Sequence, residues 1–461
     1  MALPIIRINS STGSDTAASG AGPISALTGS AASTSADGLT VTLDGSPDLS
    51  GVATDGSHVI FLNDPTAGAR NFGKIVGKDQ LLYTVTVSDA FRSSATGLSW
   101  AIGGKRASIG ATTSRKLFDN NSAAGDAMPG WIIEMEDGHA ESLGSTGIVM
   151  RRAGDATNGA ITLRGASGAS VLPKITYMNN STGIAFSSAS VARWLFEDFH
   201  VEKNATGGSH GGYAFNCAGF TTLRRIKVTD VGTTHFIYGI VGTGSTIAIG
   251  CYVENATVIG IHQCNTFYCF VRNCATGINM VNNADIKNCI GNIIYNPTTT
   301  GINIANYSYN KLVLNNTVYA NTGSPNGISF DATSTGAKFD CFFFNNAVVG
   351  CATAFVITGT SPDNAAELLA KSCIFDSNAI YNCTNQITSG YESLLTNTVT
   401  TDPQFSDPAS GDFSVGENMR AVGLPTFNIG YSATRSYVDI GAAQRQETSG
   451  VGVRGRFNGA F

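Results

Sequence analysis

From about residue 180 to residue 357, hydrophobic residues recur in a short repeated pattern. A small residue precedes a hydrophobe, a small or polar residue and a second hydrophobe. The copies begin at Gly183, Gly212, Gly239, Gly260, Gly277, Gly301, Gly327 and Ala354. The intervals vary, as they do when strands stay in register while turns change length, and the 3.6-residue spacing of helical repeats is absent. The pattern predicts an all-β fold, a right-handed single-stranded parallel β-helix. Its core would contain a column formed by Ile240, Ile261, Ile278, Ile302 and Ile328.

A second column of small buried residues is predicted beside the first. Cys251-Tyr-Val253 and Cys269-Phe-Val271 alternate inward apolar residues with outward ones. We expect Cys289, Cys341 and Cys373 to continue this column as a ladder of thiols, with Asn315 or Asn316 replacing a cysteine once. Like side chains stack in such folds because each coil repeats the backbone about 4.8 Å above the last. Asn255 and Asn273 follow at one offset and predict a short asparagine ladder.

The first third of the chain follows a different pattern. Residues 1–36 are rich in Ser, Ala, Gly and Thr, which predicts an extended low-complexity arm. Residues 37–125 contain short alternating strands punctuated by Gly and Asp, as in a small β domain that would serve for anchoring or oligomerisation. The β-helix would then occupy residues 126–400, and residues 401–461 would form its closing segment and tail.

Composition and charge narrow the possible partners. Charged residues make up 13% of the chain and hydrophobic residues 42%, which suits a folded protein of strands and tight turns. The net charge of −5 gives no reason to expect a nucleic-acid partner. The longest weakly charged run, Val231 to Val253, is too rich in Gly and Thr to predict a membrane span. No secretory signal is visible at the start, MALPIIRINSSTGS.

The ten cysteines all lie between Cys217 and Cys383. They form no CxxC pair, and the six histidines lack ligand spacing, so we expect neither a metal nor another cofactor. Most of these thiols are expected to be small core residues, although oxidation of some close pairs stays open.

These repeats, from Trp131 onward, resemble the right-handed β-helix proteins of the pectate-lyase-like superfamily. The segments Asp402–Phe413 and Asp439–Ala442 resemble the end of such proteins. An N-terminal β unit ahead of a β-helix also resembles virion surface proteins of tailed phages, tailspikes and decoration proteins among them. That resemblance implies a homotrimer located on the virion and contacting other virion proteins through the arm and the β domain.

Candidate catalytic groups are few. β-helix enzymes that cleave polysaccharides use carboxylates along one outer face. Arg225-Ile-Lys227 and His210-Gly211 match fragments of a galacturonase pattern, but the paired aspartates that should precede them are missing, so the match is interpreted as coincidental.

The acids that would act in an enzyme are Glu202, Asp230 and Glu254. Glu202 and Glu254 are expected two coils apart in one outward column, roughly 10 Å, close to the separation of an inverting pair, about 6.5–9.5 Å. Because Arg272 continues the column, a surface ion pair with Glu254 explains the pattern equally well.

The sequence is compatible with three functions. The first is a non-enzymatic structural protein on the exterior of a phage particle, a capsid or tail decoration whose β-helix projects as a rigid rod. In this hypothesis Arg435, Arg445, Arg454 and Arg456 would give the C-terminal end a positive charge. The alternative is a tailspike that binds and cleaves a host-surface polysaccharide. A secreted adhesin is disfavoured by the cysteines and by the absence of an export signal.

Overall fold

The computed structural model divides the chain into two compact units. Unit 1 contains residues 1–226 and 231–234, and unit 2 contains residues 227–230 and 235–461. The structure describes residues 4–13, 22–120, 123–179, 183–188, 191–206, 210–243, 245–281, 287–305, 311–332, 340–359, 365–416 and 440–442.

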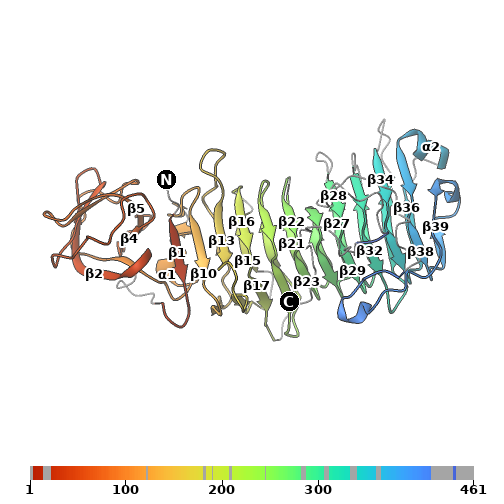
Figure 1. Ribbon diagram of the computed structural model, residues 1–461, viewed down its shortest axis with the longest axis horizontal. Helices are drawn as coiled ribbons and strands as arrows, with labels where there is room; N and C mark the ends of the chain where they lie inside the picture. Colours follow the sequence, from red (N-terminus) through yellow and green to blue (C-terminus); the bar gives the residue numbers. More distant parts are fainter. Residues whose placement is uncertain are drawn as a thin grey trace, which may run out of the picture. The chain divides into compact units, whose positions relative to one another are not determined.

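A closed barrel of six strands forms the first part of unit 1 (Figure 1). Its strands are β2 (Gly22–Thr34), β3 (Thr40–Thr42), β4 (Val59–Leu62), β5 (Phe72–Asp79), β6 (Thr84–Val87) and β7 (Leu98–Gly104). The barrel encloses its own apolar core around the buried Trp100, Ile60 and Val85. The barrel lies where the sequence predicts a small β domain, and its first strand starts before residue 37.

Three short parallel sheets complete unit 1. The first sheet contains β1 (Ile5–Ile8), β10 (Ile132–Met135), β13 (Ile161–Gly165), β16 (Trp194–Glu197) and β19 (Thr222–Arg224). The second contains β11 (Ala140–Ser142), β14 (Lys174–Tyr177) and β17 (His200–Lys203). The third contains β12 (Ile148–Val149), β15 (Ile184–Ser188) and β18 (Tyr213–Cys217). The connector after the barrel holds α1 (Thr112–Arg115), β8 (Asp119–Asn120) and β9 (Ala123–Ala124).

Within residues 1–36, where an extended arm is expected, the structure instead contains the two strands β1 and β2. Ile5–Ile8 pairs in parallel with Ile132–Met135 and so supplies the first strand of the β-helix. Gly22–Thr34 pairs with β7 in the barrel. The alternation of Ile6 and Ile8, both fully buried, explains the β-helix strand, because these side chains enter the core. In the sequence, the barrel is therefore inserted between β1 and β10, which pair directly as the first two strands of the first sheet.

Unit 2 repeats the three-sheet arrangement. Its first sheet contains β22 (Ile247–Ile249), β25 (Asn265–Phe267), β28 (Lys287–Ile290), β31 (Lys311–Leu314), β34 (Cys341–Phe344), β37 (Cys373–Asp376) and β40 (Leu395–Thr396). Its second contains β20 (Lys227–Asp230), β23 (Tyr252–Glu254), β26 (Phe270–Arg272), β29 (Ile293–Tyr295), β32 (Thr317–Tyr319), β35 (Ala347–Val349) and β38 (Ala379–Tyr381). Its third contains β21 (Tyr238–Gly242), β24 (Ile259–His262), β27 (Thr276–Val281), β30 (Thr300–Ala305), β33 (Asn326–Asp331), β36 (Thr353–Thr358) and β39 (Asn385–Ile387).

The chain thus forms the parallel β-helix that the repeats predict. Ile240, Ile261, Ile278, Ile302 and Ile328 are paired from strand to strand in one column of the third sheet. All five are buried. The helix α2 (Ala365–Ala370) and the 3-10 turns η1 (Glu392–Leu394) and η2 (Pro408–Ser410) lie in connections.

The predicted single column of cysteines is wrong, although its five members are all buried. Cys251 and Cys269 each precede a strand of the second sheet, whereas Cys289 lies in the first sheet opposite Thr266. Cys341 pairs with Cys373, and their level in the first sheet is that of Lys287 and Lys311. Small buried residues occupy several columns here, and turn lengths decide which column each one joins.

Asparagines continue the level of Cys251 and Cys269. Asn292, Asn316, Asn346 and Asn378 are fully buried, and each side-chain oxygen of the last three accepts from the amide side chain one coil before. The same oxygens accept from the backbone N–H of the preceding asparagine. Asn255 and Asn273, where the sequence predicts a short ladder, occupy the same turn position on successive coils, with left-handed φ of 65° and 53°.

The C-terminal segment packs on the outward face of the second sheet in unit 2. Phe413 contacts Phe270, Tyr295 and Tyr319, with ring centroids 5.8–6.2 Å apart. Ile440 packs beside Ala347 and Ala379. Of the closing strand expected at Asp439–Ala442, Asp439 lies outside the described residues, as do the arginines expected at the C-terminal end.

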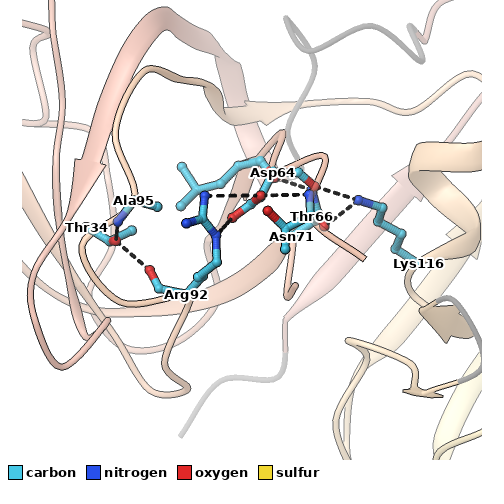
Figure 2. Close-up of polar contacts among 8 residues, drawn as sticks. Thr34, Asp64, Thr66, Asn71, Arg92, Ala95 and Lys116 are labelled. Atoms are coloured by element: carbon cyan, nitrogen blue, oxygen red, sulfur yellow. Dashed lines mark hydrogen bonds and ion pairs between the residues drawn. The ribbon is translucent and has the colours of Figure 1, made fainter. Parts of the chain in front are cut away.

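A polar network joins the barrel to the connector within unit 1 (Figure 2). Lys116 Nζ donates to Asn71 Oδ1 at 2.7 Å and to the Asp64 carbonyl at 2.9 Å, as Figure 2 shows. Asp64 accepts from Arg92 Nε at 2.7 Å. Asp126, in the connector, accepts from the Asn71 backbone N–H at 2.8 Å. Burial acts to raise the pKa of the Asp64 carboxyl, but the hydrogen bonds from Arg92 and Thr66 hold that pKa below its ordinary value.

Candidate functional site

Glu202, the first candidate acid, lies in β17 on the second sheet of unit 1. Its carboxylate accepts from Lys174 Nζ at 3.1 Å, and Lys174 belongs to β14 on the adjacent coil. The Glu202 side chain is 12% exposed. The carboxylate is therefore neutralised by a neighbour on its own face of the sheet.

Glu254, the second candidate, forms the ion pair that the sequence left as one alternative. Arg272 lies directly opposite it in β26, with Arg272 Nε 3.2 Å from Glu254 Oε1. The other oxygen accepts from the Tyr252 hydroxyl at 2.8 Å. Burial, together with this hydrogen bond to an anion, raises the pKa of Tyr252, so the phenol stays protonated. Both carboxylate oxygens of Glu254 are thus engaged, one by Arg272 and one by Tyr252, as in a carboxylate with a structural role.

Asp230, the third candidate, is buried at the end of β20. The pairing of Val228 with Val253 sets Thr229, and not Asp230, level with Glu254. Asp230 Oδ2 accepts from the backbone N–H of Phe236 at 3.0 Å and lies 3.8 Å from His235 Nδ1. The Asp230 carboxylate therefore stabilises the turn that follows β20.

The charged cluster at Glu197 and Asp198 belongs to a ladder of alternating charges on the first sheet of unit 1. Five residues occupy one level on successive strands: Arg7, Glu134, Arg164, Glu197 and Arg224. Glu134 pairs with Arg164 at 2.7 Å, and Glu197 pairs with Arg224. Arg225 donates to both Asp198 and Glu197. These acids neutralise arginines on adjacent coils, an arrangement that the alternating signs in successive strands could have indicated.

Uncharged polar residues occupy two rows on the outward side of the third sheet of unit 2, beside a third row that includes Asp331. We define this polar face by two rows of outward residues. The first row is Thr276, Thr300, Asn326, Thr353 and Asn385, paired strand to strand. The second row is His262, Asn279, Asn303 and Ser329. Amides link neighbouring coils, since Asn303 Nδ2 donates to Asn279 Oδ1 at 3.2 Å.

The glycine before each core isoleucine shapes this polar face. In strands β27 and β30, glycine and isoleucine are consecutive buried residues flanked by intermediate or buried polar ones. A Cβ on Gly277 would lie 2.5 Å from Ile294 Cγ2 and 2.6 Å from the Gly301 carbonyl oxygen. Only glycine fits there, and because Gly277 and Ile278 are both buried, the polar residues that flank them lie on the outward face. The Gly-Ile signal therefore also marks the polar face, a consequence that sequence reasoning missed.

An aromatic pair extends the polar face at β21 and β24. The rings of Tyr238 and His262 lie 5.4 Å apart. Burial lowers the pKa of His262, which keeps its imidazole neutral at neutral pH. The pair adds a flat, uncharged ring surface beside the rows of amides and hydroxyls.

No group of three or more potential metal ligands occurs among the residues that the structure describes. In the same part of the chain, no helix is long and apolar enough to cross a membrane.

Comparison with known proteins gives structural likenesses at low identity. No family model matches the sequence, and no curated protein matches it. A GH87 α-1,3-glucanase catalytic unit from Streptomyces thermodiastaticus matches with 12% identity and a TM-score of 0.30 over 78% of this chain and 76% of its own.

Two further solved structures are similar. The Azotobacter vinelandii mannuronan C-5 epimerase AlgE6 A-module has 14% identity and a TM-score of 0.24, covering 64% of this chain and 97% of its own. The tailspike protein gp49 from Pseudomonas phage LKA1 has 14% identity and a TM-score of 0.20, covering 82% of this chain and 64% of its own.

Proposed function

We propose that this chain is a structural protein of the exterior of a tailed-phage particle, and that its polar face binds an uncharged stretch of a host-surface polysaccharide. The observation that carries the proposal is the two adjacent rows of uncharged amides and hydroxyls on the third sheet of unit 2. The virion setting follows the resemblance of an N-terminal β unit ahead of a β-helix to phage surface proteins.

The chemistry of the polar face suits a neutral glycan. Asn, Thr and Ser side chains both donate and accept hydrogen bonds, as sugar hydroxyls do. Their rows repeat at the coil spacing of about 4.8 Å, so an extended chain can meet similar groups on successive coils. The Tyr238–His262 pair offers a ring surface to the apolar face of a sugar. An anionic glycan would gain no ion pair from the nine residues of the two rows.

In this proposal, the barrel attaches the protein to the phage particle. Its hairpin between β5 and β6 exposes Leu81 by 89% and Leu82 by 65%. Asp79 Oδ1 accepts from both leucine N–H groups and so fixes the tip. Adjacent exposed leucines on a fixed tip suit docking to another virion protein. Assembly as a homotrimer remains part of the proposal.

Glycan binding can be tested on purified full-length protein. Neutral and polyuronate-containing bacterial surface polysaccharides would be immobilised, and retention of the protein measured. We expect retention on a neutral polymer. Asn303→Asp keeps the side-chain shape while adding a charge to the polar face, and we expect at least a five-fold weaker affinity, equivalent to about 1 kcal/mol.

The matched control is Asn321→Asp, which adds the same charge to unit 2 at an exposed turn residue away from the two rows. Its affinity should equal that of the unmodified chain. Equal losses in both variants, or stronger retention on polyuronates than on neutral polymers, would refute the role of the polar face.

The cleaving tailspike is the rival outcome of a second assay. After incubation with the retained polysaccharide, new reducing ends or unsaturated products would identify an enzyme. Glu202→Gln, Asp230→Asn and Glu254→Gln would then show which acid acts. We expect no such products, because each of the three carboxylates is held by partners of its own chain. Immunogold labelling of intact particles tests the virion location.

A further inference from the structure

Two cysteines lie side by side on adjacent coils near the end of unit 2. Cys351 follows β35 and Cys383 follows β38, and the next strands pair Thr353 with Asn385. The Thr384 N–H donates to the Cys351 carbonyl at 3.2 Å, which continues the same register. The two cysteines are therefore level, on backbones about 4.8 Å apart.

The Cys383 side chain reaches toward the coil that carries Cys351. Its Sγ lies 3.7 Å from the Val348 carbonyl oxygen on that coil. Both thiols also contact backbone carbonyls, Cys351 Sγ that of Val349 at 3.7 Å and Cys383 Sγ that of Tyr381 at 3.5 Å. A backbone spacing of about 4.8 Å falls within the 4.4–6.8 Å range of Cα separations in disulfides.

The solvent exposure of Cys383 distinguishes this pair from the other thiols. All ten cysteines lie in the described part of the chain, and nine of them are buried, whereas Cys383 is partly exposed. The neighbouring Cys351 thiol lowers the pKa of Cys383, which favours the reactive thiolate. Cys341 and Cys373 are paired in register in the same way, but both residues are buried. They therefore serve as an internal control for the effect of exposure.

We propose that Cys351 and Cys383 form a site for thiol–disulfide exchange, at which a small disulfide such as oxidised glutathione converts the pair into a disulfide that joins two adjacent coils. The Cys383 thiolate attacks one glutathione sulfur and releases the other glutathione as a thiolate. The Cys351 thiolate then attacks Cys383 Sγ in the mixed disulfide and releases the second glutathione. Two protein thiols are oxidised, and one glutathione disulfide is reduced to two thiols.

The new bond would fasten the end of the β-helix. It closes a loop that includes β36 and α2, elements whose pairing with the coils is otherwise made by hydrogen bonds and packing. A protein produced in a reducing compartment and later exposed to an oxidising medium would gain this bond after folding. The inference does not depend on glycan binding, because neither cysteine belongs to the polar face.

The test uses folded full-length protein incubated with oxidised glutathione, followed by intact-mass measurement and peptide mapping after alkylation. We expect the unmodified protein to lose two of its ten thiols, to retain no glutathione and to yield a Cys351–Cys383 cross-linked peptide. Cys341 and Cys373 should be recovered fully alkylated after denaturation. The oxidised form should also unfold several degrees higher than the reduced form.

Two variants make the result decisive. Cys351→Ser leaves Cys383 to be attacked without a resolving thiol, so it should retain one glutathione. Cys383→Ser should retain none and lose no thiol. The proposal is overturned if the unmodified protein keeps glutathione on Cys383, if Cys383→Ser still loses two thiols, or if Cys341 and Cys373 oxidise at the same rate.

Discussion

Replacing Asn346 by alanine should show how much the buried asparagine ladder contributes to stability. Asn346 is fully buried, and its amide forms four side-chain hydrogen bonds. Its nitrogen donates to the Val313 carbonyl at 2.9 Å and to Asn378 Oδ1 at 3.0 Å. Its oxygen accepts from the backbone N–H of Asn316 at 3.1 Å and from Asn316 Nδ2 at 2.9 Å.

The expected loss can be worked out from the groups left behind. In Asn346→Ala the Asn316 backbone N–H loses its acceptor in a buried site, and the Val313 carbonyl loses one donor but keeps its place in the β31–β34 ladder, whereas Asn316 Nδ2 still donates to the Cys289 carbonyl. An unsatisfied buried group costs about 1–3 kcal/mol and a lost hydrogen bond about 1 kcal/mol, so the free energy of unfolding should fall by about 3 kcal/mol. Asn346→Asp should lose a similar amount, because a carboxylate cannot donate to the Val313 carbonyl.

Urea unfolding followed by circular dichroism measures this loss, with the slope of the transition checked for constancy. The control is Asn321→Ala at an exposed turn, which should change stability by less than about 0.5 kcal/mol. A loss below about 1 kcal/mol in Asn346→Ala would show that the ladder is not a cooperative buried network, and the reasoning from unsatisfied groups would fail.

Three further results are expected. Gly301→Ala should destabilise the protein by about 2 kcal/mol or more in urea, because its Cβ would lie 2.4 Å from a core valine carbon; an unchanged midpoint would contradict the argument that only glycine fits there. Since the folded-state pKa of Asp64 lies below 3.8, its contribution to stability is present above about pH 4 and lost as the pH falls through the folded value. Arg92→Gln should therefore flatten the stability profile in acid, and an unaltered profile would refute this. Burial raises the pKa of Cys289 to about 12, so alkylation of the folded, reduced protein at pH 8 should label Cys383 and spare Cys289; labelling of both would show that the core opens.

The sequence predicts the fold because the isoleucine column is marked by a local motif, a glycine directly before each isoleucine. From Gly239 to Gly327, a Cβ on each glycine that precedes an isoleucine of the column would lie 2.5–2.7 Å from a carbonyl oxygen of the next strand. The column of cysteines fails for the opposite reason. Cys269 and Cys289 belong to different sheets, and only the lengths of the intervening turns determine this. Cys269, Asn292 and Asn316 share a level although their side chains differ, so residue type alone is a poor guide to a column.

The candidate site was predictable only in part. The sequence placed Glu254 and Arg272 in one column, and the ion pair between them follows from that. The polar face was missed because outward Thr and Asn residues are indistinguishable in sequence from an ordinary solvated strand. Asn279 and Asn303 become a surface feature only when register places one above the other.

The position of β1 has a consequence for the order of folding. Its residues pair with a strand that begins 127 positions later, as Ile5 with Ile132. During synthesis this tetrapeptide leaves the ribosome long before its partner exists, while every strand of the barrel, which has a closed core of its own, is complete in between. Closing so distant a contact is entropically slow. The barrel, once formed, shortens the effective separation, so its folding should set the rate at which β1 covers the open edge of β10.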